Sequence, residues 1–180
     1  SSDWTSPVVF TKKSGGNLRL CVDLRALNSN ITVDSHPLPS VSDLLSKLNG
    51  AAEFYMLDLR SAYDQVELDE RSRALTAFIT PFGLFKYKRI PLRLASAASV
   101  FQRIMLHILK DMESTARYFQ DDILVFTKDS ASHMSVLEEV CRRLSNRGLI
   151  LSLNKCKLFK DQVGYLGHSV SKEGVKQKKL

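Results

Sequence analysis

The stretch "YFQDDILVF", residues 118–126, places Asp121 and Asp122 side by side between two apolar arms. The arms, "ARYF" and "ILVFT", flank a short polar middle, which is the pattern of a β-hairpin with the aspartates at or beside its turn. An acidic pair in a turn is common, because Asp stabilises turns through hydrogen bonds to nearby backbone. Adjacent carboxylates also raise the free energy of ionising each other, so the pair needs a partner.

A second acidic position lies in "AEFYMLDLRSAYDQVEL", residues 52–68. Strand alternation puts Phe54, Met56 and Asp58 on one face, so Asp58 is expected to point inward or along a cleft. Clustered carboxylates without basic partners persist where a divalent cation neutralises them, and Mg²⁺ prefers oxygen ligands. Two such ions can hold the attacking and leaving oxygens of a nucleotidyl transfer. This chemistry leaves polymerase and nuclease both open.

Length and composition describe a folded protein with a preference for polyanions. With 180 residues, 44% hydrophobic and 25% charged, the chain can bury a core as one large domain or two lobes. The net charge of +7 favours phosphate-rich partners, although similar charge occurs in proteins with no nucleic-acid role. The scattered cysteines and histidines suggest neither a disulfide framework nor a zinc site.

The ends of the sequence and its hydropathy give two further expectations. No apolar stretch approaches the roughly 20 residues that span a bilayer, and the first residues lack the order of a signal peptide. We therefore expect no membrane partner. Because the chain begins without Met and ends in the basic run "GVKQKKL", we also expect it to be a piece of a longer protein.

Strands and helices are expected along the whole chain. Two β-rich runs, residues 7–13 and 17–24, predict a hairpin with Lys12, Lys13 and Arg19 near its tip. Ser40 is expected to cap a short helix over residues 39–50. Helical spacing predicts amphipathic helices over 96–112 and 132–147, with Gln102 outside the apolar stripe of the first. Further strands are predicted in three segments: residues 74–92 with a turn at Pro81–Gly83, residues 149–159, and residues 163–175 with a turn near Lys172–Gly174.

Six motifs, in order, resemble the reverse transcriptases of gypsy-type LTR retrotransposons over about residues 4–175. They are "LRLCVDLRALN", "HPLP", "LDLRSAYDQV", "FQRIM", "FQDDILVF" and "YLGHSVS". The resemblance implies an α+β fold, the fingers and palm of a right-hand polymerase with an antiparallel palm sheet backed by helices. The fingers would be about residues 1–32 and 68–91, and the palm about 33–67 and 92–180. The thumb, connection and RNase H parts would lie beyond Leu180.

The resemblance also implies roles for individual residues. Asp58 and Asp121 would bind two Mg²⁺ ions, with Mn²⁺ as an alternative, and Asp122 would support the site. Tyr63 matches the aromatic residue that blocks a ribose 2′-hydroxyl. The other implied positions are Lys12 and Arg19 on the incoming triphosphate, Leu92 and Arg93 beside the nucleotide pocket, Leu166 and Gly167 in the primer grip, and Phe119 and Gln120 next to the catalytic aspartates.

The implied activity is RNA-directed DNA polymerisation. The partners would be an RNA or DNA template with its primer, deoxynucleoside triphosphates and the remainder of a Pol polyprotein with thumb, RNase H and integrase; a dimer is a further possibility. The implied location is intracellular, in the cytoplasm within virus-like particles.

Several positions depart from the family pattern. In "IPLRLASAASVFQ", residues 90–102, Leu92 replaces the usual Phe, Arg93 the usual Gly and Ala98 the usual Pro. A Gly allows close approach of the backbone to a substrate, so a long cation at 93 would crowd that space or reach a phosphate. Phe119 stands for the motif Tyr, and Asp64 for the usual His. A decayed or repurposed copy that binds nucleic acid without efficient polymerisation is therefore the alternative.

Overall fold

The computed structural model describes residues 4–12, 16, 18–32, 39–48, 50–160 and 162–177. The chain forms two compact units, Ser1–Ser35 with Tyr63–Ala98 and His36–Ala62 with Ser99–Leu180. The assignment of fingers to residues 1–32 and 68–91, and of palm to the rest, stays a prediction.

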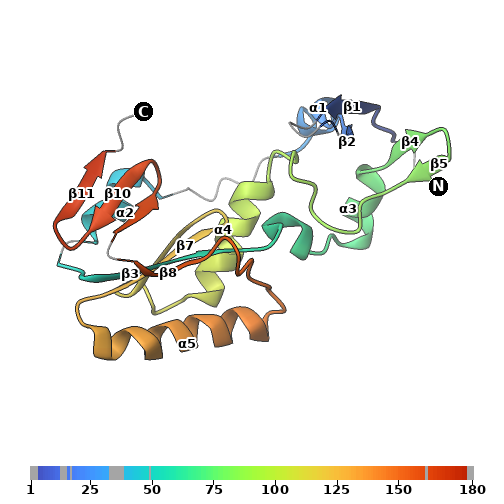
Figure 1. Cartoon of the computed structure of the whole chain (residues 1–180). Coiled ribbons are helices and arrows are strands. Elements are labelled where there is room, and N and C mark those ends of the chain that lie inside the picture. The colour runs from blue at the N-terminus through green and yellow to red at the C-terminus, as the bar shows by residue number, and fades with distance from the viewer. Residues whose placement is uncertain are drawn as a thin grey trace. The chain divides into compact units, whose positions relative to one another are not determined.

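The second unit is built on a four-stranded antiparallel sheet (Figure 1). Its order is β6 (Ala116–Phe119), β7 (Asp122–Thr127), β3 (Glu53–Asp58) and β8 (Lys157–Lys160). The two central strands carry four or more consecutive apolar residues, and these are buried on both faces of the sheet. Helix α5 (Ser130–Asn146) packs against β7 on one face. The predicted hairpin of residues 116–127 is confirmed as the β6–β7 pair.

The other face of this sheet is covered by α2 (Val41–Ser46) and by a small three-stranded sheet. That sheet has the order β11 (Gly174–Gln177), β10 (His168–Ser171) and β9 (Gln162–Tyr165). Leu44, Val163 and Tyr165 pack on Phe54 and the other apolar residues of β3 and β7. The predicted cap of α2 is confirmed, because the Ser40 hydroxyl accepts the Asp43 N–H at 3.0 Å.

The first unit contains two hairpins and three short helical segments. They are β1 (Val8–Lys12) with β2 (Leu18–Val22), β4 (Phe78–Thr80) with β5 (Gly83–Phe85), α1 (Arg25–Asn28), the 3₁₀ turn η1 (Ala62–Gln65) and α3 (Glu70–Leu75). A small core gathers Val22, Leu24 and Leu27 with Trp4 and Phe78. The first predicted hairpin is confirmed, and Gly16 near its tip has φ +80°; Lys13, Ser14 and Gly15 lie outside the described residues.

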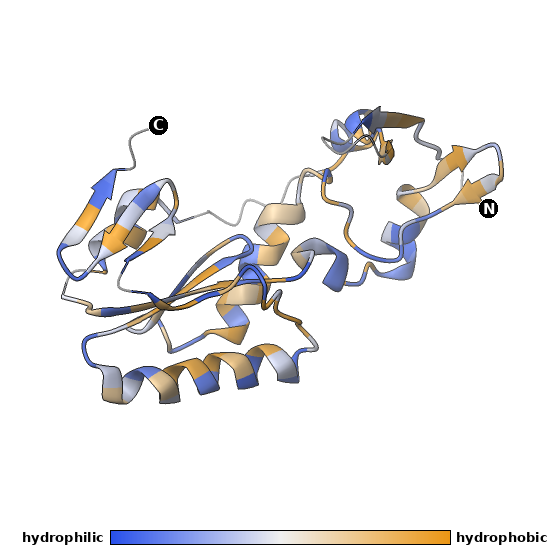
Figure 2. Cartoon of the chain, viewed as in Figure 1, coloured by the Kyte–Doolittle hydropathy of each residue, from blue (hydrophilic) through white to orange (hydrophobic). Residues whose placement is uncertain are grey.

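Hydropathy is distributed differently in the β4–β5 hairpin and in α5. Figure 2 shows β4 and β5 coloured mainly as hydrophobic, and Ile79 and Leu84 on them are 58% and 46% exposed. In α5 hydrophobic and hydrophilic residues recur in turn, as expected of a helix with one buried side. In the described part of the chain no helix combines the length and apolar character needed to cross a membrane.

Three predicted elements are shorter than expected. Strand β5 ends at Phe85, since the Tyr87 N–H donates to the Thr76 hydroxyl and the Lys88 carbonyl accepts from Leu68. Helix α4 (Ala97–Ile108) ends before Asp111, whose φ of +66° turns the chain. Residues 149–159 are a strand only from Lys157, because preceding residues fold into a turn.

Candidate active site

The two acidic segments meet at one end of the central strand pair. Along β3 and β7 the register pairs Phe54 with Phe126, Met56 with Leu124, and Asp58 with Asp122. Directly opposed residues share a face, so the two aspartates continue a column of buried apolar side chains. The predicted register of Phe54, Met56 and Asp58 is confirmed. The column ends in two carboxylates because both strands end there: Asp58 is the last residue of β3 and Asp122 the first of β7.

The third aspartate lies in the turn between β6 and β7. Phe119 pairs with Asp122, so the loop consists of Gln120 and Asp121 alone. Gln120 has φ +57°, a conformation that two-residue hairpin loops require at their first position and that favours Gly. Phe119 is half-buried against the core of the second unit. The loop therefore holds Asp121 next to the Asp58–Asp122 pair on a strained backbone.

Gln102 supports this turn from α4. Its side-chain oxygen accepts the Gln120 N–H at 3.2 Å, and only 4% of the residue is exposed. The prediction that Gln102 lies outside the apolar stripe is wrong. The signal was available, since 102, 105, 109 and 112 also follow helical spacing, and Met105, Leu109 and Met112 are buried. The buried amide is explained by the backbone group that it satisfies.

The carboxylates influence one another electrostatically. Burial raises the pKa of Asp122, and the negative charges of Asp121 and Asp58 raise it further. Tyr165, 1% exposed in the core below, also has a raised pKa, first through burial and then through the charge of Asp122. Its hydroxyl is buried without a hydrogen-bond partner in the described residues. Three acidic groups thus converge beside a dry core, and a cation is the natural way to stabilise their charged forms.

A lysine supplies part of the positive charge that stabilises these carboxylates. The ammonium of Lys155 lies 3.3 Å from Asp58 Oδ1, and Lys157 and Lys155 both act to lower the pKa of Asp122. Asp58 therefore has a basic partner in the folded chain. Ninety-seven residues separate this pair along the chain, so no local pattern could have indicated it.

The donor set is suited to a hard divalent cation. No group of three His, Cys, Asp or Glu side chains arranged for a metal occurs among the residues that the structure describes. Mg²⁺ in phosphoryl-transfer sites is commonly held by one or two carboxylates, with substrate phosphates supplying other ligands. Asp58 and Asp122, opposed and largely shielded from water, fit that mode of binding.

The predicted primer grip is a tight turn in the second unit. Leu166 and Gly167 connect β9 to β10 as a two-residue loop with φ +50° and +77°. His168 Nδ1 donates to the Leu166 carbonyl at 2.9 Å, which fixes the proton on that nitrogen. The contact of this loop with a primer stays a prediction.

The residues predicted to bind the nucleotide belong to the first unit. Lys12 is exposed at the end of β1, Arg19 lies opposite Thr11 on β2, and Tyr63 is half-buried in η1. Exposed Leu92 and Arg93 follow in a loop, where Asn28 Nδ2 donates to the Arg93 carbonyl at 2.9 Å. Their position over the aspartates of the second unit stays a prediction.

Arg93 lines a cavity of about 250 Å³ within the first unit, together with Asp23, Arg25 and Asn28. The Arg25 guanidinium binds the Asp23 carboxylate through both oxygens and holds the pKa of that group at about 2. The charge of Arg93 acts on Asp23 as well, and more weakly. A long side chain at this position therefore adds positive charge to a pocket whose carboxylate is already paired.

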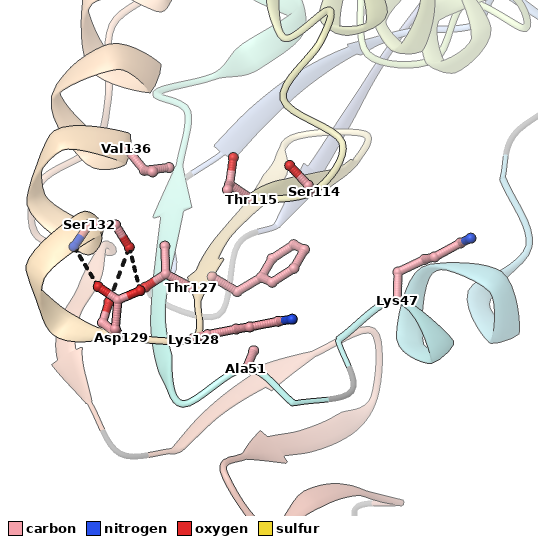
Figure 3. Close-up of a pocket in the computed structure, with 10 residues that line it drawn as sticks. Lys47, Ala51, Ser114, Thr115, Thr127, Lys128, Asp129, Ser132 and Val136 are labelled. Carbon is pink, nitrogen blue, oxygen red and sulfur yellow. Dashed lines mark hydrogen bonds between the residues drawn. The ribbon is translucent and has the colours of Figure 1, made fainter.

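Another cavity, of about 290 Å³, lies at the Thr127 end of β7, about 17 Å along the strand from Asp122 (Figure 3). Lys47, Lys128 and Asp129 contribute to its wall. Asp129 is turned toward Ser132, whose N–H and hydroxyl both donate to its carboxylate, so it serves as the cap of α5 (Figure 3). Because none of the three catalytic candidates lines it, this cavity is not the candidate active site.

Solved structures share the fold of this chain. A foamy viral protease-reverse transcriptase in complex with double-stranded DNA matches with a TM-score of 0.89 and 24% identity, over 99% of this chain and 31% of that one. The same viral protein with an RNA/DNA hybrid matches with a TM-score of 0.89 and 23% identity, over 99% and 24%. The expected fold, polymerase fingers and palm with an antiparallel sheet backed by helices, is confirmed.

Curated relatives are more similar to this chain in sequence than these solved structures are. The Retrovirus-related Pol polyprotein from transposon 297 of Drosophila melanogaster is 32% identical over 98% of this chain and 17% of its own length. The corresponding polyprotein from transposon gypsy of the same organism is 34% identical over 97% and 18%. The Transposon Tf2-3 polyprotein of Schizosaccharomyces pombe is 34% identical over 93% and 13%. The chain thus spans less than a fifth of the length of these relatives.

The model of the family described as reverse transcriptase (RNA-dependent DNA polymerase) matches residues 11–170, which include all three aspartates. The relatives confirm the expected link to retrotransposon Pol polyproteins. This chain belongs to the reverse transcriptase family.

Proposed function

We propose that this chain is the polymerising part of an RNA-directed DNA polymerase, adding deoxynucleotides to a primer 3′ end. The observation that carries the proposal is the opposed pair Asp58–Asp122, with Asp121 in the adjoining turn, at the end of a buried strand pair. Membership of the reverse transcriptase family supports the reaction class. The full activity also depends on parts of the polyprotein beyond this segment.

The three aspartates would hold two Mg²⁺ ions, with Mn²⁺ as an alternative. When bound, such ions neutralise developing charge on the attacking and leaving oxygens of the transfer. Asp58 and Asp121 would provide the main ligands, and Asp122 would contribute through its position opposite Asp58. The buried column behind them keeps water away from one side, which strengthens their electrostatic interactions.

The first unit would bind the incoming deoxynucleoside triphosphate. Lys12 and Arg19 would contact its phosphates, with Arg19 able to bind two oxygens at once. Tyr63 would exclude a 2′-hydroxyl by the bulk of its ring, and Leu92 and Arg93 would border the same pocket. In the second unit Leu166 and Gly167 would steady the primer end.

A template–primer duplex is the proposed macromolecular partner. The net charge of +7 favours it, and the structurally similar foamy viral protein has been solved with double-stranded DNA and with an RNA/DNA hybrid. The proposal has three further parts. The chain would act together with the thumb, RNase H and integrase parts of a polyprotein. It would form a dimer, and it would be located in the cytoplasm within virus-like particles.

Primer extension on an RNA template tests the proposed activity. The longer polyprotein product should extend a DNA primer only with Mg²⁺ or Mn²⁺ present, and Asp58→Asn should abolish extension. Asp111→Asn removes an exposed carboxylate at a φ that Asn tolerates and should leave extension unchanged. Extension by Asp58→Asn at the rate of the unaltered protein would refute the catalytic assignment.

Arg93 favours the second candidate, a copy that binds nucleic acid without efficient polymerisation. It adds a cation to the cavity beside Asp23 and Arg25, where the family usually has Gly. Arg93→Gly should lower the KM for deoxynucleotides or raise kcat if this side chain obstructs the pocket. Unchanged kinetics in Arg93→Gly would remove the reason for regarding the copy as impaired.

A further inference from the structure

Residues 152–156 form a turn that is anchored to the end of β3. The Asp58 carbonyl accepts the Ser152 N–H at 2.8 Å, and the Asp58 N–H donates to Cys156 Sγ at 3.5 Å. Within the turn, the N–H groups of Lys155 and Cys156 return to the Ser152 carbonyl at 2.9 and 3.2 Å. Hydrogen bonds to both the N–H and the carbonyl of Asp58 therefore anchor this turn, and with it the backbone of Lys155, beside Asp58.

The side chain of Lys155 combines this anchorage with freedom to move. Its ammonium lies 3.3 Å from Asp58 Oδ1, yet 66% of the side chain is exposed, against 20% for Asp58. An exposed ammonium on four methylenes can leave its partner and regain water readily. The carboxylate cannot do the same, because it is fixed at the end of a buried strand.

Lys155 contacts the Asp58 carboxylate, the group to which a cation at this site would bind. Asp58 faces Asp122 across the strand pair, and both lysines of the adjoining segment, Lys155 and Lys157, act electrostatically on Asp122. A divalent ion bound to Asp58 would stand close to the ammonium at 3.3 Å, and two cations in that space repel each other. Binding of both cations to the same carboxylate oxygen is therefore unfavourable.

We propose that Lys155 is the counter-ion of Asp58 in the metal-free protein and that a divalent cation binds by displacing it. This inference rests on the proposed function, because it takes Asp58 as a metal ligand. Lys155 then has opposite effects on the metal-free protein and on metal binding. It stabilises the carboxylate cluster before metal binds, and it lowers the affinity of the site for metal.

The test measures Mn²⁺ binding by the electron paramagnetic resonance signal of the free ion. Lys155→Met keeps the length of the side chain and removes its charge, and should bind Mn²⁺ about two- to five-fold more tightly, the range for a partly exposed ion pair. Lys155→Arg keeps the charge and should stay near the original affinity. Lys160→Met removes an exposed charge from β8, opposite Phe54 rather than Asp58, and is the matched control.

Thermal unfolding provides a second readout that does not require activity. The rise in melting temperature on adding saturating Mn²⁺ should be larger for Lys155→Met than for Lys160→Met, because only the first has lost its internal counter-ion. Equal Mn²⁺ affinities in Lys155→Met and the unaltered protein, or weaker binding by Lys155→Met, would overturn the inference.

A further variant separates this inference from the proposed function. Asp58→Asn should abolish the Mn²⁺ binding that Lys155→Met strengthens. Binding that Asp58→Asn leaves intact would refute Asp58 as a ligand, and both proposals would fall. Binding that depends on Asp58 but is indifferent to Lys155 would refute the counter-ion role alone.

Discussion

At the scale of single residues, the catalytic turn depends on one buried amide. Gln102 is the hydrogen-bond acceptor for the backbone N–H of Gln120, and Gln120 precedes both aspartates. Gln102→Ala should lower the free energy of unfolding by about 1–3 kcal/mol, because a buried N–H loses its partner. It should also lower kcat more than it changes KM, since the turn and not the nucleotide site is loosened. Urea unfolding and steady-state extension measure the two effects.

Asn146→Ala, which removes an exposed amide from the last position of α5, is the control for Gln102→Ala. It should change neither quantity. If Gln102→Ala were as stable as this control, the hydrogen bond to Gln120 would have no energetic role.

Gln120 itself holds a backbone conformation that disfavours side chains. At φ +57° an L-residue is less stable than Gly by about 1 kcal/mol. The hydrogen bond to the Gln102 side chain involves only the backbone N–H of Gln120, so a Gly at this position keeps it. Gln120→Gly should therefore raise the free energy of unfolding by about 1 kcal/mol in urea titrations. A decrease would show that the half-buried Gln120 side chain contributes more than the strain removes.

Asp122 gives the site a pH-dependent stability. Its pKa is raised by burial and by Asp121 and Asp58, so its contribution to stability is present below the ordinary Asp range and is lost as the pH rises through the raised pKa. Asp122→Asn should therefore melt at a higher temperature than the unaltered protein at pH 7 without metal. The difference should shrink as the pH falls through the raised pKa and the carboxyl becomes protonated. A difference that grew on acidification would contradict the sign.

At the scale of elements, α5 begins on a charged cap. The Asp129 carboxylate accepts the Ser132 N–H at 2.9 Å, and this bond is the first cause of its lowered pKa. Asp129→Ala should lower the melting temperature at pH 7 by about 2–4 °C, the effect of losing one cap in a chain of this size. A lowered pKa stabilises the folded state fully above the unfolded pKa, and this stabilisation is lost as the pH falls through the folded pKa. The loss caused by Asp129→Ala should therefore fade over that pH range.

Asp129→Asn separates the two parts of this effect. Asn caps a helix about as well as Asp but carries no charge, so at pH 7 its melting temperature should lie between those of Asp129→Ala and the unaltered protein. An Asn variant no more stable than Ala would assign the whole effect to charge.

Local pattern predicted the elements that carry the site, and long-range pairing decided the rest. Alternation in β3 placed Phe54, Met56 and Asp58 correctly on one face, and a polar middle between apolar arms located the β6–β7 turn. Lys155 and its turn were missed, because an apolar, β-rich run predicts a strand unless the backbone groups are known to bond elsewhere. Gln102 was misplaced because its polar character was given more weight than its helical spacing, which aligned it with Met105, Leu109 and Met112. Its hydrogen-bond partner, 18 residues away, could not be predicted from local pattern.

At the scale of the whole molecule, the basic side chains differ in whether they already form an ion pair. In the described part of the chain, the Lys and Arg side chains that form ion pairs bind carboxylates of their own unit, such as Lys86 with Glu70 and Arg143 with Glu139. Lys12 is exposed at the end of β1, where no such pair is found in the described structure. An exposed lysine such as Lys12 can bind a phosphate without first losing a carboxylate partner. A lysine or arginine that is already in an ion pair would have to give up that partner.

Salt dependence of template–primer binding should therefore reveal which cations contact the duplex. If about four to six phosphates are neutralised, affinity should fall by two to three orders of magnitude between roughly 50 and 200 mM salt. Lys12→Ala should reduce the slope of log K against log salt by about 1, because one phosphate contact is lost. Lys86→Ala, with the same change of charge at a residue paired with Glu70, should leave the slope unaltered. Fluorescence anisotropy with a labelled duplex measures all three proteins, and equal slopes for Lys12→Ala and Lys86→Ala would remove Lys12 from the proposed phosphate contacts.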